Sequence, residues 1–195
     1  MKERIVVGIT GASGSIYAKK LLEKLLPLPY EIHLVISDMG EKVLAHELST
    51  IPEEFISAIS EIDPSNEIIV HDSSNMFAPV ASGSFPVKAM VVIPCSMKTL
   101  ASIATGYTSN LLERASDVCL KEQRPLILVT RESPLSRVHL ENMLKAHEAG
   151  ATIMPASPGF YHHPLTIDDL IESVIARVLD HLGIKDHDAA RWEGK

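Results

Sequence analysis

The stretch from Ile5 to Ser15, IVVGITGASGS, constrains the fold more than any other part of the chain. Its first five residues are apolar and mostly β-branched, apart from one glycine, which favours a strand. Gly11 and Gly14 then permit a tight turn, and a helical pattern begins at about Ser15. A helix start offers unpaired N–H groups and the positive end of the helix dipole. The order strand, glycine turn, helix therefore predicts an α/β fold with an anion-binding site.

The spacing of the glycines limits which anion this is. They fall at positions 8, 11 and 14, so the G-x-G-x-x-G pattern is absent. That pattern is the fingerprint of dinucleotide-binding folds. The opening turn therefore predicts a phosphate site without identifying the nucleotide.

Strands and helices alternate along the rest of the chain, as judged from apolar periodicity and turn residues. Further strands are expected at residues 31–36, 67–70, 88–94, 125–130 and 151–154, and helices at 15–26, 39–48, 53–59, from 97, at 110–121, from Ser133-Pro134 to Gly150, and at 166–183. Such alternation predicts a three-layer α/β domain with a mainly parallel, six-stranded sheet. We expect one domain over residues 1–185 and a polar tail over 186–195.

Composition and charge narrow the possible partners. The formal net charge of −7 argues against electrostatically driven binding to nucleic acid or to an anionic membrane. No apolar run reaches the ~18 residues that a membrane span needs, so a cytoplasmic protein is expected. Cys95 and Cys119 lack a C-x-x-C spacing and are interpreted as buried thiols. His162 and His163 are adjacent without an H-E-x-x-H motif, so no metal is expected.

Small polar residues follow several of the expected strands. In parallel sheets, ligands bind beyond the carboxyl ends of the strands. The residues collected there are Gly11, Ala12, Ser13, Ser37, Ser96, Met97, Lys98, Thr99, Arg131, Glu132 and the loop that contains Tyr161. The turns at 10–13 and 95–99 suit a monophosphate and a polar ring edge, as in flavin mononucleotide. Ser13, Ser96 and Thr99 equally suit helix capping alone, and both interpretations stay open.

Charged residues supply candidate phosphate ligands and proton donors. Arg131 offers a planar fork for phosphate, and Lys121 and Arg177 are further cations. Each of the three also suits a surface charge or a helix ion pair. Glu47 and Glu132 are candidate general acids or bases, although lone carboxylates are usually solvated.

The connection over residues 72–87 is long and rich in helix-breaking residues, yet it carries apolar side chains at Met76, Phe77, Val80 and Phe85. Long apolar loops usually line a ligand or a partner. We therefore expect this segment to border the functional site.

Eight motifs carry a resemblance to a known family. They are Gly8–Gly14, Ala81–Ser84, Pro94–Leu100, Asn110–Ala115, Leu120–Glu122, Pro125–Glu132, His139–Leu144 and Pro155–His162. In this order, across residues 4–184, they resemble the UbiX-type flavin prenyltransferases, formerly described as phenylacrylate decarboxylases. The resemblance implies a Rossmann-like α/β/α domain, similar to the flavin-binding cysteine decarboxylases. It also implies a homo-oligomer, typically a dodecamer, with the flavin at subunit contacts.

The resemblance also implies an activity. Members of the family transfer a dimethylallyl group from dimethylallyl phosphate to reduced FMN, without a metal, and close a fourth ring on the flavin. The prenylated FMN passes to a UbiD-type decarboxylase. Whether the donor is a monophosphate or a diphosphate stays open, as does the identity of the decarboxylase that receives the product.

Roles for individual residues follow from the same resemblance. FMN would be bound by Gly11, Ala12, Ser13, Ser37, Ser96, Met97, Lys98, Thr99 and Arg131. The phosphate of the donor would be held by Lys121, Arg131, Glu132, Tyr161 and Arg177. The catalytic residues would be Ser13, Glu47, Glu132 and Tyr161. Ser13 would orient the flavin nitrogen, and either Glu47 or the released phosphate would act as the base.

One motif separates the chain from the cysteine decarboxylases. Those that act on phosphopantothenoylcysteine carry Pro-Ala-Ser-Ala-Asn-Thr where this chain has Pro94–Thr99, so Lys98 replaces their substrate-binding Asn. Two alternatives remain beside the prenyltransferase. One is a flavin-dependent decarboxylase that acts directly on an aromatic or cysteine-derived acid, and the other is a non-catalytic flavin carrier.

Overall fold

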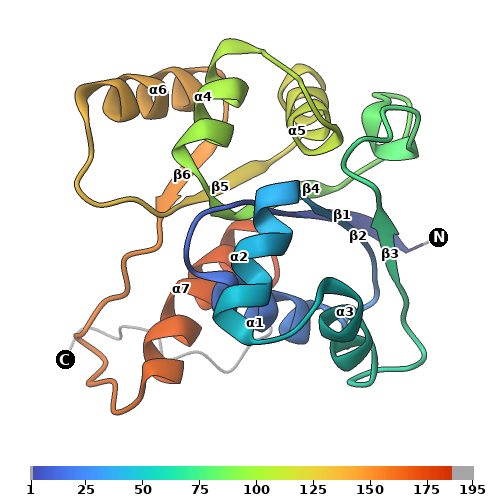
Figure 1. Ribbon diagram of the computed structural model, residues 1–195, viewed down its shortest axis with the longest axis vertical. Coiled ribbons are helices and arrows are strands. Elements are labelled where there is room, and N and C mark those ends of the chain that lie inside the picture. Colours follow the sequence, from blue (N-terminus) through green and yellow to red (C-terminus); the bar gives the residue numbers. More distant parts are fainter. Residues whose placement is uncertain (1, 186–195) are drawn as a thin grey trace.

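Six parallel strands form the central sheet of the computed structural model, which describes residues 2–185 (Figure 1). The strands are β1 (Glu3–Ile9), β2 (Tyr30–Ile36), β3 (Ile68–His71), β4 (Ala89–Cys95), β5 (Leu126–Thr130) and β6 (Thr152–Pro155). Their order across the sheet is β3-β2-β1-β4-β5-β6, and every strand pairing in the described residues is parallel. The predicted Rossmann-like architecture is confirmed. The predicted tail at 186–195 lies outside the described residues.

Helices cover both faces of the sheet (Figure 1). One layer contains α1 (Ser15–Leu25), α2 (Asp38–Leu48), α3 (Pro52–Ser60) and α7 (Ile167–His181), and the other contains the 3-10 turn η1 (Pro79–Ala81), α4 (Met97–Thr105), α5 (Leu111–Lys121) and α6 (Arg137–Glu148). Each layer encloses its own apolar core against the sheet. All seven residues of β4 are buried, as expected for a parallel strand covered on both faces.

The N-terminal starts of α7 and α6 are set by local capping interactions. The hydroxyl of Thr166 accepts from the N–H of Asp169, and the Asp169 carboxylate accepts from the N–H of Thr166, so the predicted start of α7 is confirmed. The predicted start of α6 at Ser133-Pro134 is wrong. That helix begins three residues later, because Ser136 and His139 form a capping box there.

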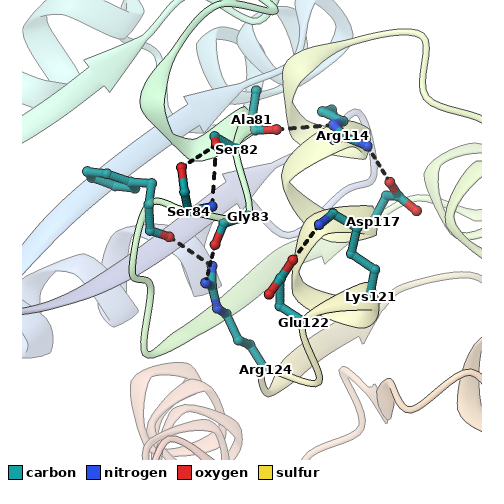
Figure 2. Close-up of polar contacts among 10 residues, drawn as sticks. Ala81, Ser82, Gly83, Ser84, Arg114, Asp117, Lys121, Glu122 and Arg124 are labelled. Carbon is teal, nitrogen blue, oxygen red and sulfur yellow. Dashed lines mark hydrogen bonds and ion pairs between the residues drawn. The ribbon is translucent and has the colours of Figure 1, made fainter.

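The connection over residues 72–87 lies against α5 (Figure 2). The guanidinium of Arg114 donates to the carbonyl of Ala81 at 3.1 Å, and that of Arg124 donates to the carbonyls of Gly83 and Phe85 at 2.6 and 2.9 Å. These bonds satisfy carbonyls that no regular element would pair.

Among the described residues, no helix is long and apolar enough to cross a lipid bilayer.

Candidate functional site

The strand order reverses between β1 and β4, where ligands bind in open α/β sheets. Thr10 joins the two turns at this point. Its hydroxyl donates to the carbonyl of Pro94 at 2.6 Å and accepts from the N–H of Ser96 at 2.8 Å. Thr10 is only 1% exposed, and its bond to the carbonyl of Pro94 is buried. The turns at 10–13 and 95–99, predicted to share a site, are therefore held together by one buried side chain.

Glu47, on α2, places its carboxylate at the start of α1. Oε2 accepts from the N–H groups of Gly14 and Ser15 at 2.9 and 2.8 Å. Burial raises the pKa of the Glu47 carboxyl, but hydrogen bonds from the Ser13 hydroxyl and these N–H groups outweigh it, so the pKa lies below its usual value. Ser13 and Glu47, both predicted to be catalytic, thus lie together.

This contact corrects the first expectation for the opening turn. The anion at the start of α1 is a side chain of the chain itself, because Glu47 occupies the N–H groups that were expected to receive a phosphate. A phosphate in the switch-point crevice, between the carboxyl ends of β1 and β4, would instead use the starts of the neighbouring helices. Gly11 packs against Met39, where a Cβ atom would come within 2.6 Å of the Met39 Cβ, and Ala12 is buried.

The starts of α2 and α4 carry the predicted serines. The Ser37 hydroxyl accepts from the N–H of Gly40 at 3.1 Å, and the Ser96 hydroxyl accepts from that of Thr99 at 3.3 Å. Both serines therefore cap helices, which for Ser96 is one of the two interpretations left open. Other N–H groups of the first turns remain for a ligand, because a cap satisfies only part of a helix start.

Lys98 and Met97 follow the Ser96 cap and differ in exposure. Lys98 is exposed and has no ion pair within residues 2–185. Met97 is 8% exposed and packs in the core, so only its backbone is placed to contact a ligand. The start of α4 thus combines peptide N–H groups with an unpaired cation, which suits a phosphate.

The end of β5 adds a second cation. The Arg131 side chain is exposed, and no hydrogen bond or ion pair engages it within the described part of the chain. Thr130 is 2% exposed, and its buried hydroxyl oxygen has no partner among the described residues. The Glu132 carboxylate accepts from the N–H of Ser133 at 3.0 Å. Because the Thr130 hydroxyl is buried, the exposed Arg131 guanidinium is the group at the end of β5 that is open to an anionic ligand.

Tyr17 lies near Arg131, and the sequence did not lead us to expect it at this site. Burial raises the pKa of its phenol, and the nearby Arg131 cation partly offsets that effect. Its ring also lies beside Gly14, where a Cβ atom would come within 3.0 Å of it. The available sequence signal was a tyrosine in the first turn of the helix that follows the glycine turn.

Two predicted phosphate ligands lie away from the carboxyl ends of the strands. Lys121 ends α5, shortly before β5 begins at Leu126, which places it at the amino edge of the sheet, and it pairs with Glu122 (Figure 2). Arg177 pairs with Asp180 at 2.7 Å. It lies ten residues into α7, about 15 Å from the start of that helix.

Ion pairs between α1 and α7 show which way Arg177 lies. Lys20 contacts Asp168 at 2.7 Å, and Lys24 contacts Glu172 at 3.1 Å, so the two helices run side by side in the same direction. Arg177 is therefore also toward the amino edge. Tyr161 is 60% exposed in the loop after β6. One chain alone thus divides the predicted donor-phosphate residues between two edges of the sheet.

The described residues fit a flavin mononucleotide better than a metal. The carboxyl edge of the sheet carries the exposed cations Lys98 and Arg131 together with helix-start N–H groups. No group of three or more His, Cys, Asp or Glu side chains within residues 2–185 is arranged to hold a metal ion. Cys95 and Cys119 are buried, and burial raises the pKa of each thiol to about 12.

Comparison with known proteins identifies the family. The flavoprotein family model matches residues 1–179. The flavin prenyltransferase UbiX of Alkalihalophilus pseudofirmus is 47% identical, with 98% of this chain and 99% of the relative covered.

Two solved structures are similar over nearly the full chain. AnUbiX (PadA1), in complex with FMN and dimethylallyl pyrophosphate, superposes with a TM-score of 0.92 at 42% identity, covering all of both chains. A dodecameric FMN-dependent UbiX-like decarboxylase from Escherichia coli O157:H7 has a TM-score of 0.90 at 42% identity, covering 98% of this chain and all of the other. The chain belongs to the flavoprotein family and, within it, to the UbiX flavin prenyltransferases.

Proposed function

We propose that this protein transfers a dimethylallyl group from dimethylallyl phosphate or diphosphate to reduced FMN. One observation carries the proposal: this chain, in which Thr10 joins the turns at 10–13 and 95–99 and Ser13 bonds to Glu47, matches AnUbiX, solved with FMN and dimethylallyl pyrophosphate, over its full length. No metal takes part in the proposed reaction.

FMN would lie across the switch point between β1 and β4. Lys98, Arg131 and the helix starts at Ser37 and Ser96 would hold its polar and phosphate groups, with Met97 and Thr99 contributing through the backbone of α4. Gly11, Ala12 and Ser13 would form the wall beside its ring. When bound in reduced form, FMN supplies the ring nitrogen that attacks the prenyl group.

The donor phosphate would be held by Lys121, Arg131, Glu132, Tyr161 and Arg177. Cations and a phenol on this group stabilise the charge that develops as it departs. Because Lys121 and Arg177 lie toward the other edge of the sheet, they would reach the crevice from neighbouring subunits. The apolar segment at 76–85 would exclude water from the allylic cation.

Glu47 is placed for proton transfer. Its lowered pKa keeps the carboxylate ionised at neutral pH, so it is able to accept a proton near Ser13. The released phosphate is the alternative base. We also propose that the protein forms a homo-oligomer, by analogy with the dodecameric UbiX-like protein, and that a UbiD-type decarboxylase uses the product.

An anaerobic mass measurement tests this function. Purified protein, reduced FMN and dimethylallyl phosphate are expected to yield a flavin heavier by one prenyl unit, and parallel reactions with the diphosphate compare the donors. The Ser13→Ala variant serves as the matched control and is expected to lower the yield.

Direct decarboxylation is the second candidate, because the similar Escherichia coli structure is described as a decarboxylase. It requires carbon dioxide release from an aromatic or cysteine-derived acid without any partner enzyme. Release of carbon dioxide with an unchanged flavin mass would favour this candidate over prenyl transfer.

A further inference from the structure

A row of polar side chains crosses β1, β2 and β3 and takes no part in the proposed reaction. The Arg4 guanidinium donates to Glu31 Oε1 at 2.6 Å, and His33 Nε2 lies 2.8 Å from the same oxygen. His33 Nδ1 lies 2.8 Å from His71 Nε2, and the two rings are nearly coplanar, at 4°. His33 is 2% exposed, so a row of this kind costs stability unless every member is hydrogen-bonded.

The partners determine the protonation of the neutral row. A carboxylate only accepts, so His33 Nε2 must carry the proton that it shares with Glu31. His33 Nδ1 is then an acceptor, and His71 Nε2 must be the donor across the 2.8 Å contact. The remaining nitrogen of His71, Nδ1, is therefore unprotonated.

The free nitrogen of the pair is His71 Nδ1. Burial and the His33 ring lower the pKa of His71, so this histidine binds a proton less readily in the closed row than after its ring has moved into water. Acid therefore favours opening of the His33–His71 contact. The Arg4 and His33 hydrogen bonds lower the pKa of Glu31, so its carboxylate stays charged.

The row contacts both ends of segment 72–87. His71 immediately precedes the segment. At the other end, the Phe85 ring meets His33 edge-on, with ring centroids 5.3 Å apart, and the Arg4 guanidinium lies 4.4 Å above the centre of the same ring. Breaking the pair therefore loosens the two ends of one segment together.

Other charged groups around the row are already engaged. Asp72, next to His71, accepts from the N–H and the hydroxyl of Ser74. From α5, Arg114 bonds to Asp117 and to the segment. From beyond α5, Arg124 bonds to the carbonyls of Gly83 and Phe85, which leaves the α5 side of the segment attached when the histidine pair opens.

We propose that the Glu31–His33–His71 row is a proton-sensitive latch that holds the two ends of segment 72–87 on the sheet at neutral pH and loosens them in mild acid. Only one consequence depends on the proposed function: release would admit water to the allylic cation, so prenyl transfer would fall with the latch.

Hydrogen exchange of the amides at 78–85 tests the latch in flavin-free protein. After division by the intrinsic chemical rate, exchange in the wild type is expected to rise about tenfold between about pH 7.5 and about pH 5.5. In His71→Gln the side-chain amide donates to His33 without titrating, so the corrected rate is expected to stay flat. His181→Gln, at an exposed histidine in the last turn of α7, is expected to behave like the wild type.

An equal rise in His71→Gln and the wild type would overturn the proposal, as would a flat wild-type curve. If His71→Gln does not fold, nitrogen NMR of the wild type decides. Protons on Nε2 of both His33 and His71 at neutral pH are required, and any other pair of tautomers defeats the latch. These measurements contain no flavin, so the latch and the proposed function can fail independently. The latch is supported if exchange depends on pH as expected even when the protein transfers no prenyl group, and it fails if exchange does not, even when prenyl transfer is observed.

Discussion

Glu47 Oε2 lies 2.9 Å from the backbone nitrogen of Gly14, a residue 33 positions earlier in the chain. The contact brings the end of α2 to the start of α1 and places a carboxylate where the helix dipole is positive. It also puts this carboxylate beside the Ser13 hydroxyl. One side chain thus completes a helix start and forms part of the candidate site.

Replacing Glu47 with Gln is expected to lower both stability and activity. The amide lacks the charge that favours the helix start, so the free energy of unfolding should fall by about 0.5–1 kcal/mol, a small effect because the site is partly exposed. The pKa of Glu47 is lowered from its usual 4.5, so its stabilisation is present above that value and is lost as pH falls through the lower, folded-state pKa.

Thermal unfolding of the wild type and of Glu47→Gln across this range checks the expectation. The two curves should converge in acid. Glu67→Gln, at an exposed carboxylate that precedes β3 and lies at no helix start, is the control. A difference between the wild type and Glu47→Gln that persists at the acid end would count against the proposed role of the charge.

Thr10→Val is expected to separate the two turns of the crevice. Valine has nearly the same shape, but it leaves the N–H of Ser96 without its partner and the carbonyl of Pro94 with only the backbone N–H of residue 10, which costs about 1–3 kcal/mol in urea unfolding. FMN affinity, followed by flavin fluorescence, should fall with it. Thr10→Ser keeps the hydroxyl and should lose much less. Thr105→Val, at an exposed hydroxyl that bonds only within its own helix, should change FMN affinity little.

Gly40→Ala tests the packing of α2 against β1. A Cβ atom at Gly40 would lie 2.6 Å from the carbonyl oxygen of Ile9, and backbone cannot move aside cheaply. We expect a loss of about 1–3 kcal/mol by overpacking, together with weaker FMN binding near Ser37. A Cβ atom at Gly106 would have no atom within 4 Å, so Gly106→Ala adds only backbone strain from the positive φ of this residue. The FMN affinity of this variant should be unchanged. Equal FMN affinities for the two variants would argue against a flavin at the start of α2.

Mixed oligomers test whether the site is shared between subunits. Ser13→Ala removes a crevice residue, and Lys121→Ala removes a cation at the other edge of the sheet. Each variant alone should be nearly inactive. After dissociation and random reassembly, about a quarter of the sites would combine intact residues from two neighbours, so roughly a quarter of the wild-type activity should return. No recovery would mean that both residues act within one chain, whereas full activity of Lys121→Ala alone would mean that Lys121 takes no part.

The two cysteines are expected to be inert in the folded protein. Burial raises the pKa of both Cys95 and Cys119 to about 12, so thiolate is scarce at pH 8. A disulfide reagent that reports free thiols should react with neither until denaturant is added. Rapid reaction of one thiol in native protein would show that its strand or helix opens locally.

Several elements were predictable because their signals are local. The strand from Ile5, the glycine turn and the helix stripe behind it depend on side-chain size and periodicity within a few residues. The Thr166–Asp169 capping box marked the start of α7 for the same reason. At α6, the start expected at Ser133-Pro134 was wrong, because Ser136 and His139 form a capping box three residues later.

The sequence by itself determined the class of fold, because alternating strands and helices with apolar strands admit few arrangements other than a three-layer α/β domain. It also indicated the residues of the crevice, since they directly follow strands. Tertiary structure alone decided which of them meet: Thr10 joins two turns about 85 residues apart, Glu47 takes the helix start expected for a phosphate, and Lys121 and Arg177 lie toward the far edge of the sheet. The physical reason is that strand order and helix direction, which no local pattern encodes, set the distances between residues remote in sequence.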